Sequence, residues 1–244
     1  MSELLKYAFV IFTYRDDAYL LGQTLRALKA ITPMRRVFVF DDAANPLPYP
    51  PHGVRYSQTH FKRNGNLNGT ECAEGELFCM YEAAMKVKAD VVIKLDSDII
   101  LNNLKWLTDG NPLEEQIGFK LRAEQNFCSG ACYSLPTEAL VKMLRILAKT
   151  PRNDFKGESI IMSYLARSAG YYVRLWDCSE KVDSELWRAS SINASAVRDG
   201  QINSRELLLM KNLDVVYCTL ISEQRDKNAD YALMKSYLDN KYSL

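Results

Sequence analysis

Two aspartates separated by one residue stand at the end of an apolar run in the middle of the chain. The run begins at Val91, and Asp96, Ser97 and Asp98 close it. Its β-branched composition predicts a buried strand that carries both carboxylates at its C-terminal end. Side chains at positions i and i+2 of an extended chain point to the same side. We therefore expect Asp96 and Asp98 to share one hard divalent cation, Mn²⁺ or Mg²⁺, because such ions prefer oxygen ligands.

The same triplet also occurs by chance as two solvated acids at a strand end, so its neighbours matter. Two other apolar runs end in polar side chains. They are Tyr7–Thr13, followed by Tyr14 and Arg15, and Val37–Phe40, followed by Asp41 and Asp42. In open α/β sheets, ligands bind at the C-terminal ends of the strands, which is where all these residues fall.

The elements that must position these residues alternate between strand and helix. The hydrophobic pattern predicts a helix that Asp16 and Asp17 cap and that ends by Pro33. Further strands are predicted over residues 54–57, 117–121, 127–133 and 171–176, and further helices over residues 77–87, 137–149, 158–168 and 228–242. This order indicates a mostly parallel sheet with helices on both faces.

Composition sets the limits of this interpretation. The chain has 244 residues, of which 48% are hydrophobic, enough for one large α/β domain with a sizeable core. A formal charge of +1 gives no reason to expect nucleic acid as a partner. No apolar run approaches a membrane span, and the N-terminal residues lack a secretory pattern, so we expect a cytoplasmic protein. The six cysteines form no paired Cys-x-x-Cys motif, which argues against structural zinc.

Four segments, taken in order, resemble nucleotide-sugar glycosyltransferases of the GT-A fold. Phe9–Arg15 resembles the first strand and the turn around the nucleotide base, and Val37–Asp42 resembles the second strand, whose acid binds the base or ribose. Ile93–Ile99 resembles the Asp-x-Asp segment, and Phe127–Ser134 resembles the Cys-Ser-Gly-Gly-x-Tyr segment. The last two segments are similar to the β1,3-galactosyltransferase type, and the overall pattern to inverting family 2-like enzymes.

This resemblance implies a Rossmann-like α/β fold of the GT-A type, in a single domain with a C-terminal extension. Residues 1–176 would form the core, with the nucleotide-sugar bound within residues 7–100 and the acceptor within residues 117–176. Residues 177–244 would add an acceptor-side loop and a helix.

The implied activity is a metal-dependent transfer of a sugar from a nucleotide-diphosphate donor, with a UDP-sugar expected, to a hydroxyl of a saccharide or glycan acceptor. Asp98, assisted by Asp96, would bind Mn²⁺ or Mg²⁺. The resemblance assigns the donor to Thr13, Tyr14, Arg15, Asp42, Asp96 and Ser97, with Lys62 and Arg63 neutralising the diphosphate when their loop closes.

The sequence departs from the family at the position of the catalytic base. Inverting members carry a Glu-Asp pair at the start of a helix that a glycine ends twelve residues after the Glu. Here Glu158 and Gly170 match this spacing, but Ser159 replaces the Asp. Glu158 is therefore the expected base, with Asp154 as a second candidate, and inversion at the anomeric carbon is expected. If no carboxylate reaches the acceptor, a retaining course is favoured.

Other interpretations remain open at this point. The serine at the base position is compatible with a weakly active or non-catalytic sugar-nucleotide-binding protein. A nucleotidyltransferase would need a Gly-rich loop after the first strand, and Thr13–Asp17 contains no glycine. Phosphatases of the Asp-x-Asp type carry the pair after the first strand, not after the fourth. Among groups that could contact the acceptor are Asp177 and Trp187.

Overall fold

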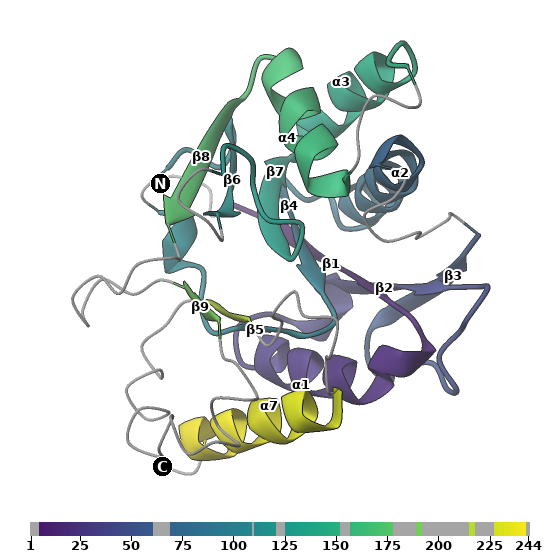
Figure 1. The fold of residues 1–244 in the computed structure, drawn as a ribbon, viewed down its shortest axis with the longest axis vertical. Coiled ribbons are helices and arrows are strands. Elements are labelled where there is room, and N and C mark those ends of the chain that lie inside the picture. Colours follow the sequence, from purple (N-terminus) through teal and green to yellow (C-terminus); the bar gives the residue numbers. More distant parts are fainter. Residues whose placement is uncertain are drawn as a thin grey trace.

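The computed structural model describes residues 5–60, 69–108, 110–120, 125–151, 157–177, 189–191, 215–217 and 227–242. Their main feature is a seven-stranded sheet with helices on both faces (Figure 1). The strands stand in the order β3-β2-β1-β4-β7-β6-β8. They comprise β1 (Tyr7–Thr13), β2 (Val37–Asp42), β3 (Arg55–Thr59), β4 (Val91–Asp96), β6 (Glu115–Lys120), β7 (Cys132–Pro136) and β8 (Tyr172–Asp177).

The sheet is mostly parallel, as the alternation of strands and helices predicts. Strands β1, β2, β3 and β4 pair in parallel, and so do β6 and β8. Strand β7 lies between β4 and β6 and is antiparallel to both. The α/β fold class expected from the sequence is therefore confirmed.

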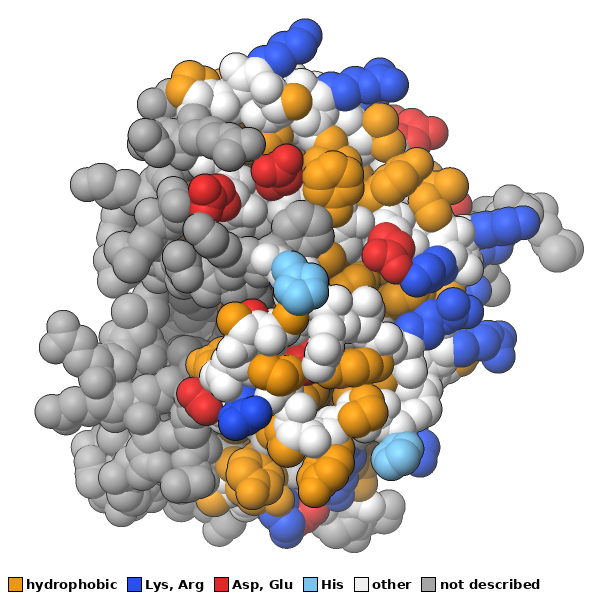
Figure 2. Space-filling model, turned by 90° about the vertical axis from the view of Figure 1, so that its right-hand side faces the viewer, with side chains coloured by type: hydrophobic (Ala, Val, Ile, Leu, Met, Phe, Trp, Pro, Cys, Tyr) orange, Lys and Arg blue, Asp and Glu red, His pale blue; other side chains and the backbone are white. Residues whose placement is uncertain are grey.

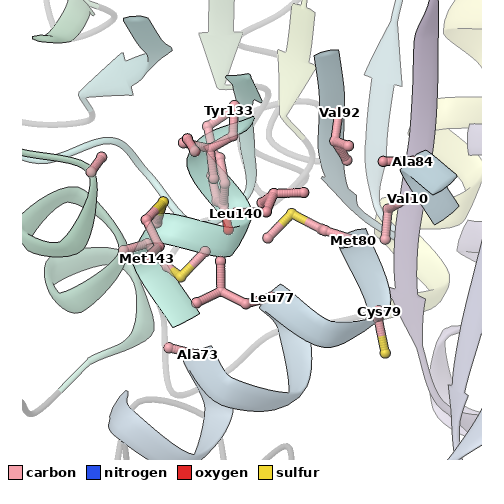
Figure 3. Close-up of a cluster of buried hydrophobic side chains, with 14 of the residues drawn as sticks. Val10, Ala73, Leu77, Cys79, Met80, Ala84, Val92, Tyr133, Leu140 and Met143 are labelled. Atoms are coloured by element: carbon pink, nitrogen blue, oxygen red, sulfur yellow. The ribbon is translucent and has the colours of Figure 1, made fainter. Parts of the chain in front are cut away.

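The helices divide between the two faces of the sheet because the strands are apolar on both sides. Helix α1 (Ala18–Lys29) covers one face, where Leu21 and Leu28 pack with alternate residues of β1 and β2. Helices α2 (Gly69–Val87), α3 (Thr137–Leu147) and α4 (Glu158–Ser168) cover the other face. Figure 3 shows this second core, where Leu77 and Met80 of α2 lie beside Leu140 and Met143 of α3.

A smaller sheet and the C-terminal helix complete the described part of the molecule. The second sheet has the order β5-β10-β9, from Ile99–Leu101, Val215–Tyr217 and Ala189–Ser191. Helix α7 (Lys227–Tyr242) lies beside α1 (Figure 1), joined to it by an Arg26–Asp239 ion pair of 2.6 Å. The predicted C-terminal helix is confirmed. Within the described residues, no helix combines the length and apolar character needed to cross a bilayer.

Several predicted boundaries were wrong. The strand expected over residues 127–133 is β7, Cys132–Pro136, because the segment before it forms a turn against α4. The helix expected to begin at Leu77 begins at Gly69. Gly69 and Gly75 weaken the local helical signal, but both are buried where α2 packs, and packing overrides propensity.

The surface carries both apolar and charged side chains. Figure 2 shows hydrophobic side chains beside Lys and Arg on the face that lies at the right of Figure 1. The exposed large hydrophobic residues on the helices include Phe78 and Met85 of α2 and Ile160 and Tyr164 of α4. Scattered apolar residues of this kind are ordinary on protein surfaces.

Candidate active site

The polar strand ends predicted from the sequence meet at one edge of the seven-stranded sheet. Strand β1 pairs with β2 on one side and with β4 on the other, so the chain changes direction across the sheet at β1. Thr13 is in register with Asp41, and Phe12 with Asp96. Such a switch point, at the C-terminal ends of the strands, is where ligands bind in open α/β sheets. The structure therefore brings the ends of β1, β2 and β4 together.

The two aspartates do not share the extended backbone that their spacing suggested. Strand β4 ends at Asp96, and Ser97 and Asp98 form a turn that leads into β5. The expected i, i+2 geometry of a strand was therefore wrong, because the chain leaves the sheet immediately after Asp96. The Asp96 side chain is 34% exposed, whereas Asp98 as a residue is only 5% exposed.

Hydrogen bonds to the N-cap residue of helix α1 and to a residue within it hold this turn in place. The hydroxyl of Ser97 donates to Asp17 Oδ2 at 2.7 Å, and Thr24 Oγ1 donates to the Ser97 carbonyl at 2.7 Å. Asp17 occupies the N-cap position of α1 but makes no capping hydrogen bond with its side chain. The prediction that Asp17 caps this helix was therefore wrong, because its carboxylate binds the turn instead.

The ends of β1 and β2 place the predicted donor-binding residues differently. The Thr13 side chain is fully buried. Arg15 stays on the surface, where its Nε donates to the carbonyl of Pro46 at 3.1 Å. Asp42 Oδ1 accepts from the amide of Ala44 at 2.9 Å and remains partly exposed.

Asp41, the neighbour of Asp42, has a structural role. Its Oδ2 accepts hydrogen bonds from the Leu47 amide at 2.8 Å and from the Tyr56 hydroxyl at 2.6 Å. The side chain is fully buried, so it fixes the loop after β2 to β3. Of the two acids, Asp42 is the one that a ligand can reach.

A lysine that sequence reasoning did not select lies at the centre of the site. Lys94 of β4 is 1% exposed, and its Nζ lies 2.7 Å from Asp96 Oδ1 and 3.7 Å from Glu158 Oε1. It also donates to the carbonyl of Gly130 and lies 5.9 Å from the centre of the Tyr133 ring. The available signal was a charged residue inside a buried strand, which requires a partner.

The charge of Lys94 is fixed by the acids around it. Burial by itself lowers the pKa of Lys94, but the carboxylates of Asp96, Glu158 and Glu76 outweigh burial and raise the pKa above its ordinary value. Lys94 therefore stays an ammonium ion at neutral pH. One buried cation faces three carboxylates, so the cluster favours a further positive charge nearby.

Glu158, the predicted base, is close to the predicted metal ligand Asp96. It begins α4, its side chain is 16% exposed, and Lys94 bridges it to Asp96. In the described part of the chain, Glu158 Oε1 is buried and accepts no hydrogen bond. The next residue, Ser159, accepts a hydrogen bond from the Gly130 amide at 2.9 Å.

Some predicted residues lie outside the described part of the chain: Lys62, Arg63, Asp154, Trp187 and the side chain of Asp177. Among the residues that are described, no group of three or more His, Cys, Asp or Glu side chains is arranged to hold a metal ion. Asp96 and Asp98 would therefore supply two carboxylates, each through one oxygen or both. An all-oxygen pair beside an excess of carboxylates fits Mg²⁺ or Mn²⁺, which keep water and phosphate oxygens as further ligands.

No protein-family model matches the chain. No curated protein matches it either.

Solved structures do share its architecture. A glycosyltransferase involved in the glycosylation of the major capsid of PBCV-1 superimposes with a TM-score of 0.53 and 12% identity, over 94% of this chain and 99% of that one. GlyE of Streptococcus pneumoniae TIGR4, also a glycosyltransferase, gives a TM-score of 0.52 and 12% identity, over 98% of this chain and 64% of that one. The chain has a GT-A-type glycosyltransferase fold. LgtC, a galactosyltransferase solved with donor and acceptor sugar analogues, shares the GT-A architecture with a TM-score of 0.50 and 13% identity, over 95% of each chain.

Proposed function

We propose that this protein is a glycosyltransferase that moves a sugar from a nucleotide-diphosphate donor to a hydroxyl of a saccharide or glycan. The observation that carries the proposal is the Asp96–Asp98 turn at the switch point of a sheet with the GT-A fold. The fold alone does not define an activity, so the argument rests on the carboxylates and their surroundings.

The donor side of the site would centre on this turn. Asp96 and Asp98 would hold Mn²⁺ or Mg²⁺, which supplies positive charge to the diphosphate leaving group when bound. Arg15 and Asp42 lie on the accessible side of the strand ends, which suits contacts with the nucleoside. The Thr13 side chain is buried, and so is the Ser97 hydroxyl, which donates to Asp17. We therefore assign the remaining donor contacts to Tyr14, Lys62 and Arg63, and expect UDP as the nucleotide.

The acceptor side would centre on Glu158. Its carboxylate lies beside the donor-side acid Asp96, across the Lys94 ammonium. As a base it would take the proton of the attacking hydroxyl, and the anomeric carbon would be inverted. Asp154 is the second candidate for the base. Retention of configuration would indicate that neither carboxylate acts in this way.

A metal-dependent shift of the unfolding temperature tests the donor side. UDP, GDP, TDP and CDP are each added with and without Mn²⁺ to the wild type, to Asp98→Asn and to the control Asp90→Asn. Asp90 lies before β4, at the opposite end of the strand from Asp98. A ligand at about a hundredfold excess over its dissociation constant stabilises the folded state by about 2.7 kcal/mol. We expect a Mn²⁺-dependent shift with UDP that Asp98→Asn loses and Asp90→Asn keeps.

Turnover then separates the transferase from a second candidate, a sugar-nucleotide-binding protein without activity. The second candidate is motivated by Ser159, whose hydroxyl is engaged with the Gly130 amide. Release of UDP from a UDP-sugar in the presence of an acceptor, with NMR of the new linkage, establishes transfer and its stereochemistry. A shift without turnover of any activated sugar would favour the binder, and no shift with any nucleotide would contradict both.

A further inference from the structure

Lys94 links three segments that lie far apart in the sequence. It pairs with Asp96 at the end of β4, donates to the carbonyl of Gly130 before β7, and forms an ion pair with Glu158 at the start of α4. We propose that Lys94 is a positioning residue for sugar transfer, which fixes the donor-side acid Asp96 relative to the acceptor-side groups Gly130 and Glu158. This inference rests on the function proposed above.

The chemistry of the ammonium group matches this arrangement. An ammonium ion has three N–H donors and accepts no hydrogen bond. Around Lys94 stand three oxygen atoms from three elements, two within hydrogen-bond range and Glu158 Oε1 at 3.7 Å. A single buried cation therefore joins the two sides of the site through two hydrogen bonds and one ion pair.

Burial separates the role of Lys94 from that of Asp96. Lys94 is 1% exposed, so it acts through its neighbours and not on a substrate. The Asp96 side chain in front of it is 34% exposed and can be reached from solvent. Lys94 thus binds Oδ1 of the Asp96 carboxylate from the protein interior, and the carboxylate remains accessible from the site.

Both backbone polar groups of Gly130 make hydrogen bonds with side chains. Its carbonyl accepts from Lys94 and its amide donates to Ser159 Oγ at 2.9 Å. The carbonyl of the next residue, Ala131, accepts from the Asp96 amide at 2.9 Å. Ser159, which replaces the expected Asp, thus has a structural role: its hydroxyl accepts the hydrogen bond that holds this turn against α4.

The first test compares Lys94→Met with the wild type. Lys142→Met, at a remote site, is the control. Lys142 is exposed and contacts the hydroxyl of Tyr171 at 3.2 Å, away from the carboxylates. Loss of a group that orients a metal ligand typically costs about 10- to 100-fold in metal affinity or activity. Removing the ammonium leaves the surrounding carboxylates free to attract Mn²⁺, so we expect Lys94→Met to retain Mn²⁺ binding and to lower kcat by that factor, with little change in the acceptor KM.

A second readout needs neither metal nor substrate. Hydrogen exchange of the Gly130 and Asp96 amides, followed by NMR, reports the hydrogen bonds of the turn directly. We expect faster exchange of both amides in Lys94→Met and unchanged exchange in Lys142→Met. A purely structural role elsewhere in the core would leave these two amides protected.

Two further variants keep the test decisive if Lys94→Met does not fold. Lys94→Met/Glu76→Gln removes one positive and one negative charge, because buried Glu76 also faces the lysine, and leaves Asp96 and Glu158 intact. Lys94→Arg keeps the charge, but a planar guanidinium presents its donors differently. Glu76→Gln alone is the control for the double variant.

The outcomes separate this inference from the function on which it rests. A folded Lys94→Met or double variant with wild-type kcat and amide exchange would overturn the role of Lys94 and leave the transferase intact. Rescue of kcat by Lys94→Arg would show that the buried positive charge carries the role. A wild type with neither a nucleotide shift nor turnover would overturn both. A lowered kcat in Lys94→Met with faster exchange of the Gly130 amide would support the proposal.

Discussion

Gly130 shows how closely the site is packed at the level of single residues. A Cβ atom at this position would lie 2.7 Å from Ser159 Oγ and 3.0 Å from Glu158 Oε2. Such distances require a neighbour to move, and both neighbours belong to the site. The glycine is therefore needed for close approach of the turn to α4.

We expect Gly130→Ala to displace Ser159 and Glu158 and to lower kcat about tenfold, because small misplacements at a reacting centre are costly. Loss of the hydrogen bond to Ser159 is expected to cost about 1 kcal/mol of stability. The control is Gly22→Ala on the exposed side of α1, where a Cβ would meet nothing within 4 Å. Steady-state kinetics and urea unfolding of both variants measure these effects, and unchanged kcat in Gly130→Ala would contradict the assigned packing.

At the level of elements, the far side of the sheet depends on an ion pair between β6 and β8. Arg174 of β8 contacts both oxygens of Glu115 in β6, with Nε and Nη2 each at 2.7 Å, and the Asn111 amide donates to the same carboxylate at 2.9 Å. β8 stands at the edge of the seven-stranded sheet, so it pairs on one side only within that sheet. The Arg174–Glu115 ion pair adds side-chain contacts to the backbone hydrogen bonds between β6 and β8.

Acid should weaken this connection. The hydrogen bond from Arg174 lowers the pKa of Glu115 and outweighs the opposite effect of burial. The stabilisation is therefore present above the unfolded-state pKa, about 4.3, and is lost as the pH falls through the lower folded-state pKa. We expect Glu115→Gln to cost about 1 kcal/mol or less near pH 7, after solvent screening, and to cost progressively less below about pH 4. Urea unfolding from pH 3 to pH 7 measures this.

Glu114→Gln is the matched control, because the neighbouring Glu114 is exposed. Its unfolding free energy should follow that of the wild type over the whole pH range. A difference between wild type and Glu115→Gln that grows as the pH falls would contradict the assigned sign.

At the level of the whole molecule, the C-terminal helix joins the N-terminal half of the fold. Helix α7 buries Met234, Tyr237 and Leu238, and the hydroxyl of Tyr237 accepts from Asn102 Nδ2 at 2.5 Å. Asn102 directly follows β5, the strand into which the Asp96–Asp98 turn leads. The last described helix thus supports the segment that follows the candidate metal ligands.

We expect Leu238→Ala to destabilise the protein by about 3 kcal/mol, because it removes a fully buried side chain and leaves a cavity between α7 and its neighbours. Ser236→Ala, at an exposed position of the same helix, should change the unfolding free energy by less than about 0.5 kcal/mol. Urea unfolding followed by circular dichroism measures both. A Leu238→Ala protein as stable as the wild type would mean that α7 contributes little to the folded unit.

The sequence by itself determined the strands and helices that carry the site. Buried strands of a parallel sheet are apolar on both faces, so β1, β2 and β4 appear in the sequence as continuous apolar runs. The polar residues that end these runs can be read directly from the sequence. The acids at those ends, Asp42, Asp96 and Asp98, were likewise selected from position alone. Resemblance to GT-A enzymes then predicted an architecture that the structural comparison confirms.

Only the tertiary structure decided how these residues meet. The oxygen atoms around Lys94 come from Asp96, Gly130 and Glu158, and no local pattern indicates which distant residues will surround a buried lysine. The turn at Ser97 also escaped prediction, because its bonds to Asp17 and Thr24 come from a helix about 80 residues earlier. Propensity and periodicity act over one element, whereas a buried charge is stabilised by whatever the fold brings within a few ångströms of it.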